Sequence, residues 1–353
     1  MNRLIPDSAF EAMPQFMLLL IAAGAIYYLM KGADWLVDGA AGLAGRVGMP
    51  KVIVGATIVS LGTTSPEAAV SVMAAWEGNA GLALGNAVGS IIADTGLIFG
   101  LGCCLVVLPA DRFVLTRQGW VKVGSCVLLA GLCYLAFAMD GDEATLGRWV
   151  GILLVVLLFA YLAVSVRWGR QHPHGEPFVE SDVTIEGHTA PEATWALLSL
   201  LVLGLVLVVF SSQFVIGSVT QLAVIWDVPD VVIASTLVAF GTSLPEFVVG
   251  MTSIAKGHRE LLVGNVIGAD ILNVLFVVGA SALARPLPIV DMTANVPRIF
   301  LYLHLPTMLI MIGLFLWYIL GAAKRGHFHR WQGYPLLVLY VAFVAIQYVI
   351  EKS

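Results

Sequence analysis

Two short segments carry the same polar motif inside apolar sequence, and they limit the possible folds of this chain more than any other feature. Residues 62–67 read Gly-Thr-Thr-Ser-Pro-Glu, and residues 241–246 read Gly-Thr-Ser-Leu-Pro-Glu. Each motif places a carboxylate one residue after a proline, within a stretch long enough to cross a membrane. A charged side chain at that depth is energetically expensive and by default marks a functional site.

The motif belongs to a longer internal repeat. Residues 52–100 align without a gap on residues 231–279, at a constant offset of 179, with 15 identities in 49 positions. Only 12% of the residues are charged, whereas a soluble domain averages about 25%. Apolar stretches of membrane-crossing length occur at 14–40, 52–76, 81–108, 118–139, 147–168, 193–223, 230–255, 261–283, 297–320 and 333–350.

These ten stretches divide into two sets of five. Because five is odd, the second copy of the repeat must enter the membrane from the opposite side, as in many secondary transporters. The predicted fold is an all-α polytopic membrane protein with ten transmembrane helices in two five-helix inverted-topology repeats. We expect an N-terminal half at 1–168, a cytoplasmic linker at 169–192 and a C-terminal half at 193–353, with α-repeats at about 52–104 and 230–284.

The Lys and Arg residues of the short loops predict the orientation. On the side opposite the N-terminus we count twelve, including Lys122, against five on the other side. Positive loops face the cytoplasm, so both termini are expected outside. The composition predicts a multi-pass membrane protein.

The residues of the motif suggest a cation site. Proline opposes continuation of the preceding helical turn, and freed carbonyls near Ser60–Thr63 and Ala239–Thr242 would then point at a ligand. Carbonyl, hydroxyl and carboxylate oxygens suit Ca²⁺, Na⁺ or Mg²⁺ rather than Zn²⁺ or copper. Two facing glutamates, Glu67 and Glu246, would neutralise one divalent cation.

The second part of each repeat adds further polar candidates. Residues 85–94 and 264–273 both contain Gly-Asn-x-x-Gly, a spacing that allows helices to approach closely. Ser90 and Asp94 are four residues apart and share a helix face. Asp94 aligns with Asn273, whereas Asp270 aligns with an isoleucine and is an additional carboxylate.

Two other features have simpler interpretations. Asp94-Thr95-Gly96 spells the tripeptide of aspartic proteases, but no second copy occurs, so we do not expect an enzyme. Lys31 and Asp34 have the spacing of an ion pair within one helix.

The two motifs, each followed by Gly-Asn-x-x-Gly, resemble the α-repeats of the cation/calcium exchanger superfamily, and of prokaryotic sodium/calcium exchangers in particular. The resemblance implies four central cation sites, with Ca²⁺ ligands from Glu67, Glu246 and the carbonyls of Thr63 and Thr242. Sodium positions would draw on these two glutamates and on Thr64, Ser243, Ser90, Asp94, Asn273 and the carbonyls of Ser60 and Ala239. Here the carboxylate stands at 94 and the amide at 273, whereas the prokaryotic pattern has the reverse.

The sequence therefore predicts an antiporter that exchanges Ca²⁺ for Na⁺ by alternating access. An exchanger of the same fold that couples Ca²⁺ or another divalent cation to H⁺ is the first alternative, and a cation channel is the second. We expect no cofactor, because Ca²⁺ and Na⁺ or H⁺ are the transported ions. The expected partners are calcium and sodium ions and the lipid bilayer, with no nucleic acid and no obligatory protein partner.

Overall fold

The computed structural model describes residues 8–171, 193–226, 241–290 and 298–352. The α-helices are α1 (Ser8–Glu11), α2 (Gln15–Val47), α3 (Lys51–Val54), α4 (Ser60–Thr63), α5 (Ser65–Glu77), α6 (Ala80–Ala93), α7 (Gly100–Leu105), α8 (Arg112–Asp140), α9 (Arg148–Gln171), α10 (Thr194–Ile225), α13 (Leu244–Ala255), α14 (Arg259–Leu272), α15 (Gly279–Ala284), α16 (Leu305–Arg325) and α17 (Gly333–Lys352). Short π-helical and 3₁₀ segments connect them: η1 (Gly55–Val59), η2 (Asp94–Phe99), η3 (Gly141–Glu143), η6 (Asn273–Val278), η7 (Phe300–His304) and η8 (Arg330–Gln332). The described residues also form four strands of two residues each: β1 (Leu108–Pro109), β2 (Thr145–Leu146), β3 (Leu287–Pro288) and β4 (His327–Phe328).

The prediction of an all-α polytopic membrane fold is confirmed. Eight continuous helical stretches of the described chain are long and apolar enough to cross a bilayer, and two shorter apolar helices cover Lys51–Thr63 and Leu244–Ala255. The shorter helices lie in the two expected spans that carry the Pro-Glu motif. The linker predicted at 169–192 falls mostly outside the described residues, and the boundaries of the two halves stay a prediction.

The repeat extends to the boundaries of the elements. Moving α6 by 179 residues gives the bounds of α14, and the same shift converts η2 into η6, α7 into α15 and β1 into β3. Identical interruptions at equivalent positions indicate that both copies fold in the same way locally.

The two halves of the chain are interlocked rather than placed side by side. The strand β1 pairs antiparallel with β4, and β2 pairs antiparallel with β3, so each small sheet joins one half to the other. The contacts of α8 with α16, of α9 with α15 and of η1 with α14 also cross between the halves. A site between the repeats is therefore built by both.

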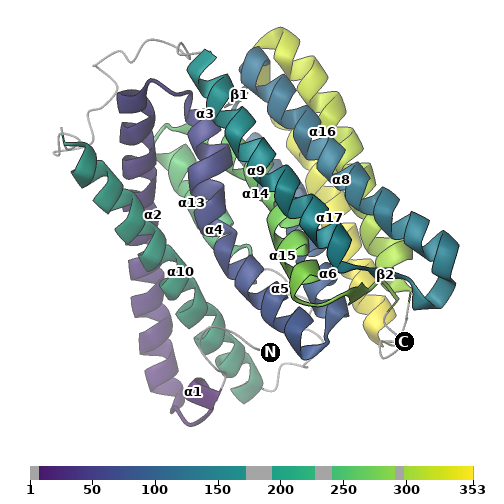
Figure 1. Ribbon diagram of the computed structural model, residues 1–353. Coiled ribbons are helices and arrows are strands. Elements are labelled where there is room, and N and C mark those ends of the chain that lie inside the picture. The colour runs from purple at the N-terminus through teal and green to yellow at the C-terminus, as the bar shows by residue number, and fades with distance from the viewer. Residues whose placement is uncertain (1–7, 172–192, 227–240, 291–297, 353) are drawn as a thin grey trace.

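The helices α2 and α10 form a pair that runs along one flank of the bundle (Figure 1). Glycines allow this close crossing. A Cβ added at Gly39 would lie 2.6 Å from the backbone nitrogen of Leu201, and one added at Gly204 would meet the backbone of Leu36. In the same view, α1 and the end of α17 lie at the same end of the bundle.

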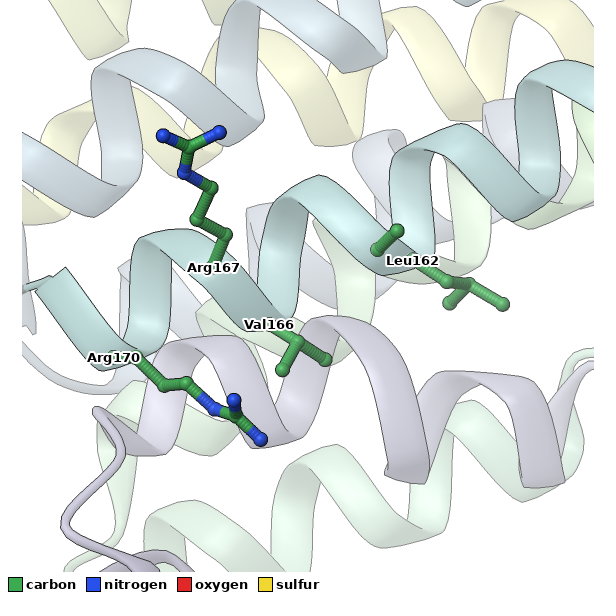
Figure 2. Close-up of a pocket in the computed structure, with 5 residues that line it drawn as sticks. Leu162, Val166, Arg167 and Arg170 are labelled. Atoms are coloured by element: carbon green, nitrogen blue, oxygen red, sulfur yellow. The ribbon is translucent and has the colours of Figure 1, made fainter.

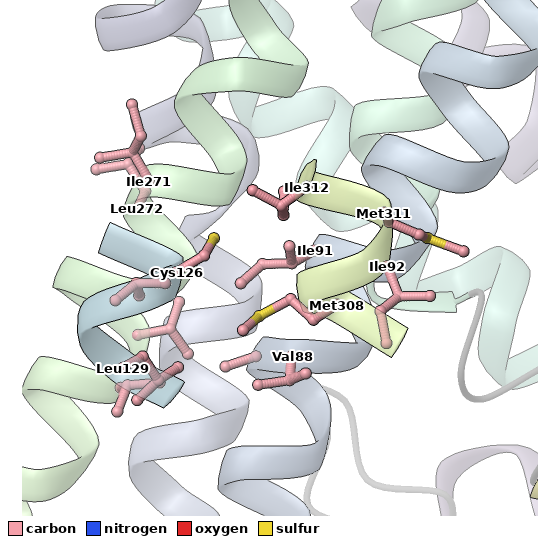
Figure 3. Packing of buried hydrophobic residues seen from close by; sticks show 14 of the residues in the cluster. Val88, Ile91, Ile92, Cys126, Leu129, Ile271, Leu272, Met308, Met311 and Ile312 are labelled. Carbon is pink, nitrogen blue, oxygen red and sulfur yellow. The ribbon is translucent and has the colours of Figure 1, made fainter. Parts of the chain in front are cut away.

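The largest apolar core lies in the remainder of the bundle. Figure 3 shows side chains from α6, α8, α14 and α16 converging, among them Ile91, Cys126, Ile271 and Met308. All four side chains are fully buried. This core fixes the second segment of each repeat, where the remaining polar candidates lie.

Candidate cation-binding site

The Pro-Glu motif starts a new helix in both repeats. Thr64 ends α4 with φ −81° and ψ −6°, and α5 begins at the next residue with Pro66 in its first turn. Ser243 has nearly the same geometry before α13, with φ −87° and ψ 9°. Proline is well tolerated in a first turn, since the first helical N–H groups have no helical partner. The glutamates thus fall in the first turns of α5 and α13, where the helix dipole favours negative charge.

The two glutamates are buried and lie close to each other. Glu67 is 0% exposed and Glu246 is 1% exposed. The carboxyl group of Glu67 interacts with Glu246 and with Asp94. Thr64 Oγ1 donates a hydrogen bond of 3.3 Å to Glu246 Oε1, so residues of the two motifs meet directly. Buried carboxylates of both repeats therefore lie together, and their binding of a cation stays a prediction.

The second segments bring an aspartate and an asparagine to equivalent places. Asp94 opens η2 and Asn273 opens η6, and each is the fifteenth residue of its 26-residue apolar helix (94 − 79 and 273 − 258). Both are therefore near the middle of a predicted span. Single π-helical turns within α-helices occur frequently at functional sites.

Many oxygens of this centre are buried and have no hydrogen-bond partner among the described residues. Burial of polar groups without partners is costly, so each such atom requires an explanation. The set comprises Glu67 Oε1 and Oε2, Glu246 Oε2, Asp94 Oδ1 and Oδ2, Asn273 Oδ1, Ser90 Oγ and Ser243 Oγ, and Oδ1 of the adjoining Asp270 is likewise without a partner among the described residues. No group of three or more His, Cys, Asp or Glu side chains in the described parts is arranged to hold a metal ion. A cation here would need hydroxyl, amide or carbonyl oxygens as well.

Close helix packing positions these groups. A Cβ added at Gly264 would collide with the carbonyl oxygen of Val52, and one added at Gly268 would collide with the Ala56 carbonyl and Ser60 Oγ. The Gly-Asn-x-x-Gly segment of α14 therefore packs directly on α3, η1 and α4. The equivalent partners of the first-repeat glycines would fall at 231–239, outside the described residues.

The threonine and serine candidates lie at the breaks between helices. Thr63, Thr64 and Ser243 are fully buried, and Thr242 is 7% exposed. Thr63 Oγ1 lies 3.4 Å from Asn265 Oδ1 of the other repeat. Ala239 lies outside the described residues, so its predicted carbonyl contribution stays a prediction.

The Ser60 carbonyl is less free than expected. It accepts a hydrogen bond of 2.8 Å from the Thr64 N–H and a longer one of 3.4 Å from Thr63 Oγ1. The helix therefore continues to Thr64 before it breaks, and the Ser60 carbonyl oxygen would have to coordinate a cation while it also accepts these hydrogen bonds.

Asp270 has a partner that the sequence interpretation missed. Lys122 was counted among the loop cations, and this was wrong, because it lies inside α8 with a fully buried side chain. Its Nζ is 2.6 Å from Asp270 Oδ2 and donates to Thr95 Oγ1 at 2.9 Å. A signal was available, since Lys122 falls within the apolar stretch at 118–139, and a charge there is a functional candidate.

The acidic residues of α2 also have a different partner from the one expected. Lys256 Nζ lies 2.7 Å from both carboxylate oxygens of Asp38 and 3.6 Å from Asp34 Oδ1. A pair between Lys31 and Asp34 was expected from spacing alone. The observed ion pair instead ties α2 to the end of α13.

A surface depression on α9 is a poor candidate for a cation site. It is lined by Leu162, Ala163, Val166, Arg167 and Arg170, all on α9, and Figure 2 shows the two arginines extending from that helix. The five described residues that line it include no carboxylate, the ligand type that divalent cations prefer.

Comparison of the sequence with known proteins identifies the family to which this chain is similar. The family of sodium/calcium exchanger proteins matches residues 17–167 and 196–349. Sodium/calcium exchanger MaX1 of Methanosarcina acetivorans is 28% identical, over 95% of this chain and 99% of its own. Inner membrane protein YrbG of Escherichia coli is 31% identical, over 76% of this chain and 79% of its own.

Solved structures show the same fold. Structures of the sodium-calcium exchanger NCX_Mj, soaked with Na⁺ and Sr²⁺ or with Na⁺ and Ca²⁺, are 26% identical to this chain. The first has a TM-score of 0.75, over 94% of this chain and 99% of the other. The fold is that of a multi-pass membrane transporter. This chain belongs to the sodium/calcium exchanger family.

Proposed function

We propose that the protein is a secondary active antiporter that moves Ca²⁺ across the membrane in exchange for Na⁺ by alternating access. The observation that carries this proposal is the set of buried, unpartnered oxygens at repeat-equivalent positions, above all Glu67 with Glu246 and Asp94 with Asn273. Carboxylate, amide and hydroxyl oxygens are the ligands that Ca²⁺ and Na⁺ prefer. The similarity to MaX1 and NCX_Mj supports the same pair of ions.

Charge balance explains how the two ions would be coupled. Glu67, Glu246 and Asp94 lie within electrostatic range of one another, and their mutual repulsion is strong in a low-dielectric interior. The centre therefore requires positive charge. A divalent cation together with a full set of monovalent ions would reverse its sign, so the two kinds of ion exclude each other. Such opposition between two ligands is a coupling free energy, and it links the two fluxes.

The ions are cargo, and we propose no resident cofactor and no catalysed reaction. The other partner is the lipid bilayer, which the long apolar helices would span. We place the protein in the cytoplasmic membrane of a bacterium or an archaeon, with both termini outside.

One asymmetry between the repeats keeps H⁺ as a second candidate for the counter-ion. Ser90 supplies a buried hydroxyl in the first repeat, whereas the equivalent residue of the second repeat is Ala269. One flanking position thus has one oxygen fewer, which weakens it for Na⁺. A carboxyl group such as Asp94 would instead take up a proton.

Calcium-45 uptake into everted membrane vesicles separates these candidates. Vesicles loaded with Na⁺ and diluted into Na⁺-free medium are expected to accumulate Ca²⁺, also when an ionophore collapses the pH gradient. Uptake that a pH gradient alone drives, and that Na⁺ does not, would replace Na⁺ with H⁺. Calcium-45 flux that depends on neither the Na⁺ gradient nor the pH gradient would indicate a channel.

A further inference from the structure

The buried pair of Lys122 and Asp270 adjoins the acidic centre but is not explained by ion exchange alone. Both side chains are 0% exposed, with Nζ and Oδ2 2.6 Å apart. Thr95 completes a triangle, since its Oγ1 donates to the same Oδ2 at 2.7 Å and lies 2.9 Å from Nζ. The Phe315 ring centroid is 3.7 Å from the ammonium group, a distance at which a cation interacts favourably with an aromatic face.

Apolar side chains of the largest core also adjoin the pair. Cys126, one turn beyond Lys122 on α8, and Ile271, next to Asp270, both belong to the buried cluster of Figure 3. Removing two charges from water is expensive, and a hydrophobic pair of similar volume is often as stable or more stable. Stability alone is therefore a weak reason for an ion pair at this position.

The repeat shows that Asp270 is an addition to one half. Its equivalent in the first repeat is Ile91, and the equivalent of Thr95 is Val274, both fully buried. Asp270 is also electrostatically linked to the ion site, because Asp94 lies within range of both Asp270 and Lys122. Without a cation of its own, this extra carboxylate would bring the negative charge of the centre from three to four.

We propose that Lys122 is a tethered cation that holds Asp270 out of the exchange site and thereby sets how much charge the transported ions must balance. With Lys122 in place, Glu67, Glu246 and Asp94 supply three negative charges to the transported ions. Lys122 is a positioning residue that determines the coupling ratio. This inference rests on the proposed antiport and adds the residue that fixes its ion count.

The charge count predicts an order among variants. Lys122→Met retains much of the side-chain length and removes the charge, leaving four negative charges. Asp270→Asn leaves the ammonium facing Asp94, so the net charge falls to two. The double variant Lys122→Met/Asp270→Asn returns to three, and Asp270→Glu keeps the charge of the native pair.

The test measures the Na⁺:Ca²⁺ coupling ratio in proteoliposomes, from the membrane potential at which net calcium-45 flux stops under fixed gradients. The expected ratio rises by about one Na⁺ in Lys122→Met, falls by about one in Asp270→Asn, and equals that of the native protein in the double variant and in Asp270→Glu. Equal ratios in all variants would assign the pair a purely structural role and overturn the proposal.

The set of variants distinguishes a failure to fold from a failure of the proposal. If Lys122→Met does not fold, Asp270→Asn and the double variant still decide the question, because their predicted ratios differ. A native protein without any Na⁺-driven calcium flux would refute the proposed antiport itself, which is distinct from an unchanged ratio among active variants.

Discussion

Substituting Gly268 by alanine tests whether close packing of the two repeats positions the cation site. The added Cβ would collide with the carbonyl oxygen of Ala56 and with Ser60 Oγ. Backbone atoms of η1 cannot rotate away, so α14 must move relative to η1 and α4. Overpacking of this kind costs about 1–3 kcal/mol, and the displacement falls on Ser60, one of the predicted contributors to the site.

The expected result is a lower thermal unfolding midpoint and weaker exchange, measured by fluorescence-detected unfolding of the purified protein and by calcium-45 uptake. A binding loss of about 1.4 kcal/mol corresponds to a tenfold change in apparent affinity. The matched controls are Gly131→Ala and Gly124→Ala on α8, where an added Cβ meets nothing within 4 Å among the described residues. These should be neutral or slightly stabilising, because alanine favours helix over glycine. A Gly268→Ala protein indistinguishable from the controls would refute the packing argument.

Three further predictions concern charges. Glu67→Gln or Glu246→Gln should each abolish calcium-45 exchange, and retained exchange in both single variants would refute the site. Burial and a neighbouring lysine lower the pKa of His258 to about 4 from its ordinary 6.5, so stability present above pH 6.5 should fall as the pH drops towards 4. His258→Gln should flatten this pH dependence of the unfolding midpoint, and an unchanged pH profile would contradict it. A double-mutant cycle on Lys256 and Asp38 should give a coupling free energy of about 1 kcal/mol or less, because the pair is partly exposed; several kcal/mol would show that it is effectively buried.

The local motifs made much of the site predictable from the sequence. The glycine, proline and glutamate of the motif can be recognised in each copy from their fixed spacing. The second copy, at an offset of 179 residues, predicts that the two halves build one centre. The same repeat gave the equivalence of Asp94 and Asn273. The roles of these residues in binding ions stay predictions.

Contacts between segments far apart in the chain could not be predicted from local sequence patterns. The partner of Asp270 is Lys122 on another helix, and the partner of Asp38 is Lys256, separated from it by 218 residues. Spacing along the sequence predicts ion pairs within one helix. Charged side chains that face the bundle instead form ion pairs with residues that tertiary packing brings close, and local sequence does not specify those residues. The π-helical turn at Asp94 and the cross-half strand pairs also follow from packing and not from any local signal.

Equilibrium binding of calcium-45 to the purified protein over a range of Na⁺ concentrations tests the central claim most directly. We expect Ca²⁺ bound at the acidic centre to be released as the Na⁺ concentration rises, with a steep dependence on Na⁺, and we expect Glu67→Gln to abolish this binding. Calcium binding that Na⁺ leaves unchanged, or that persists in Glu67→Gln, would contradict exclusive occupancy of a site shared by the two repeats.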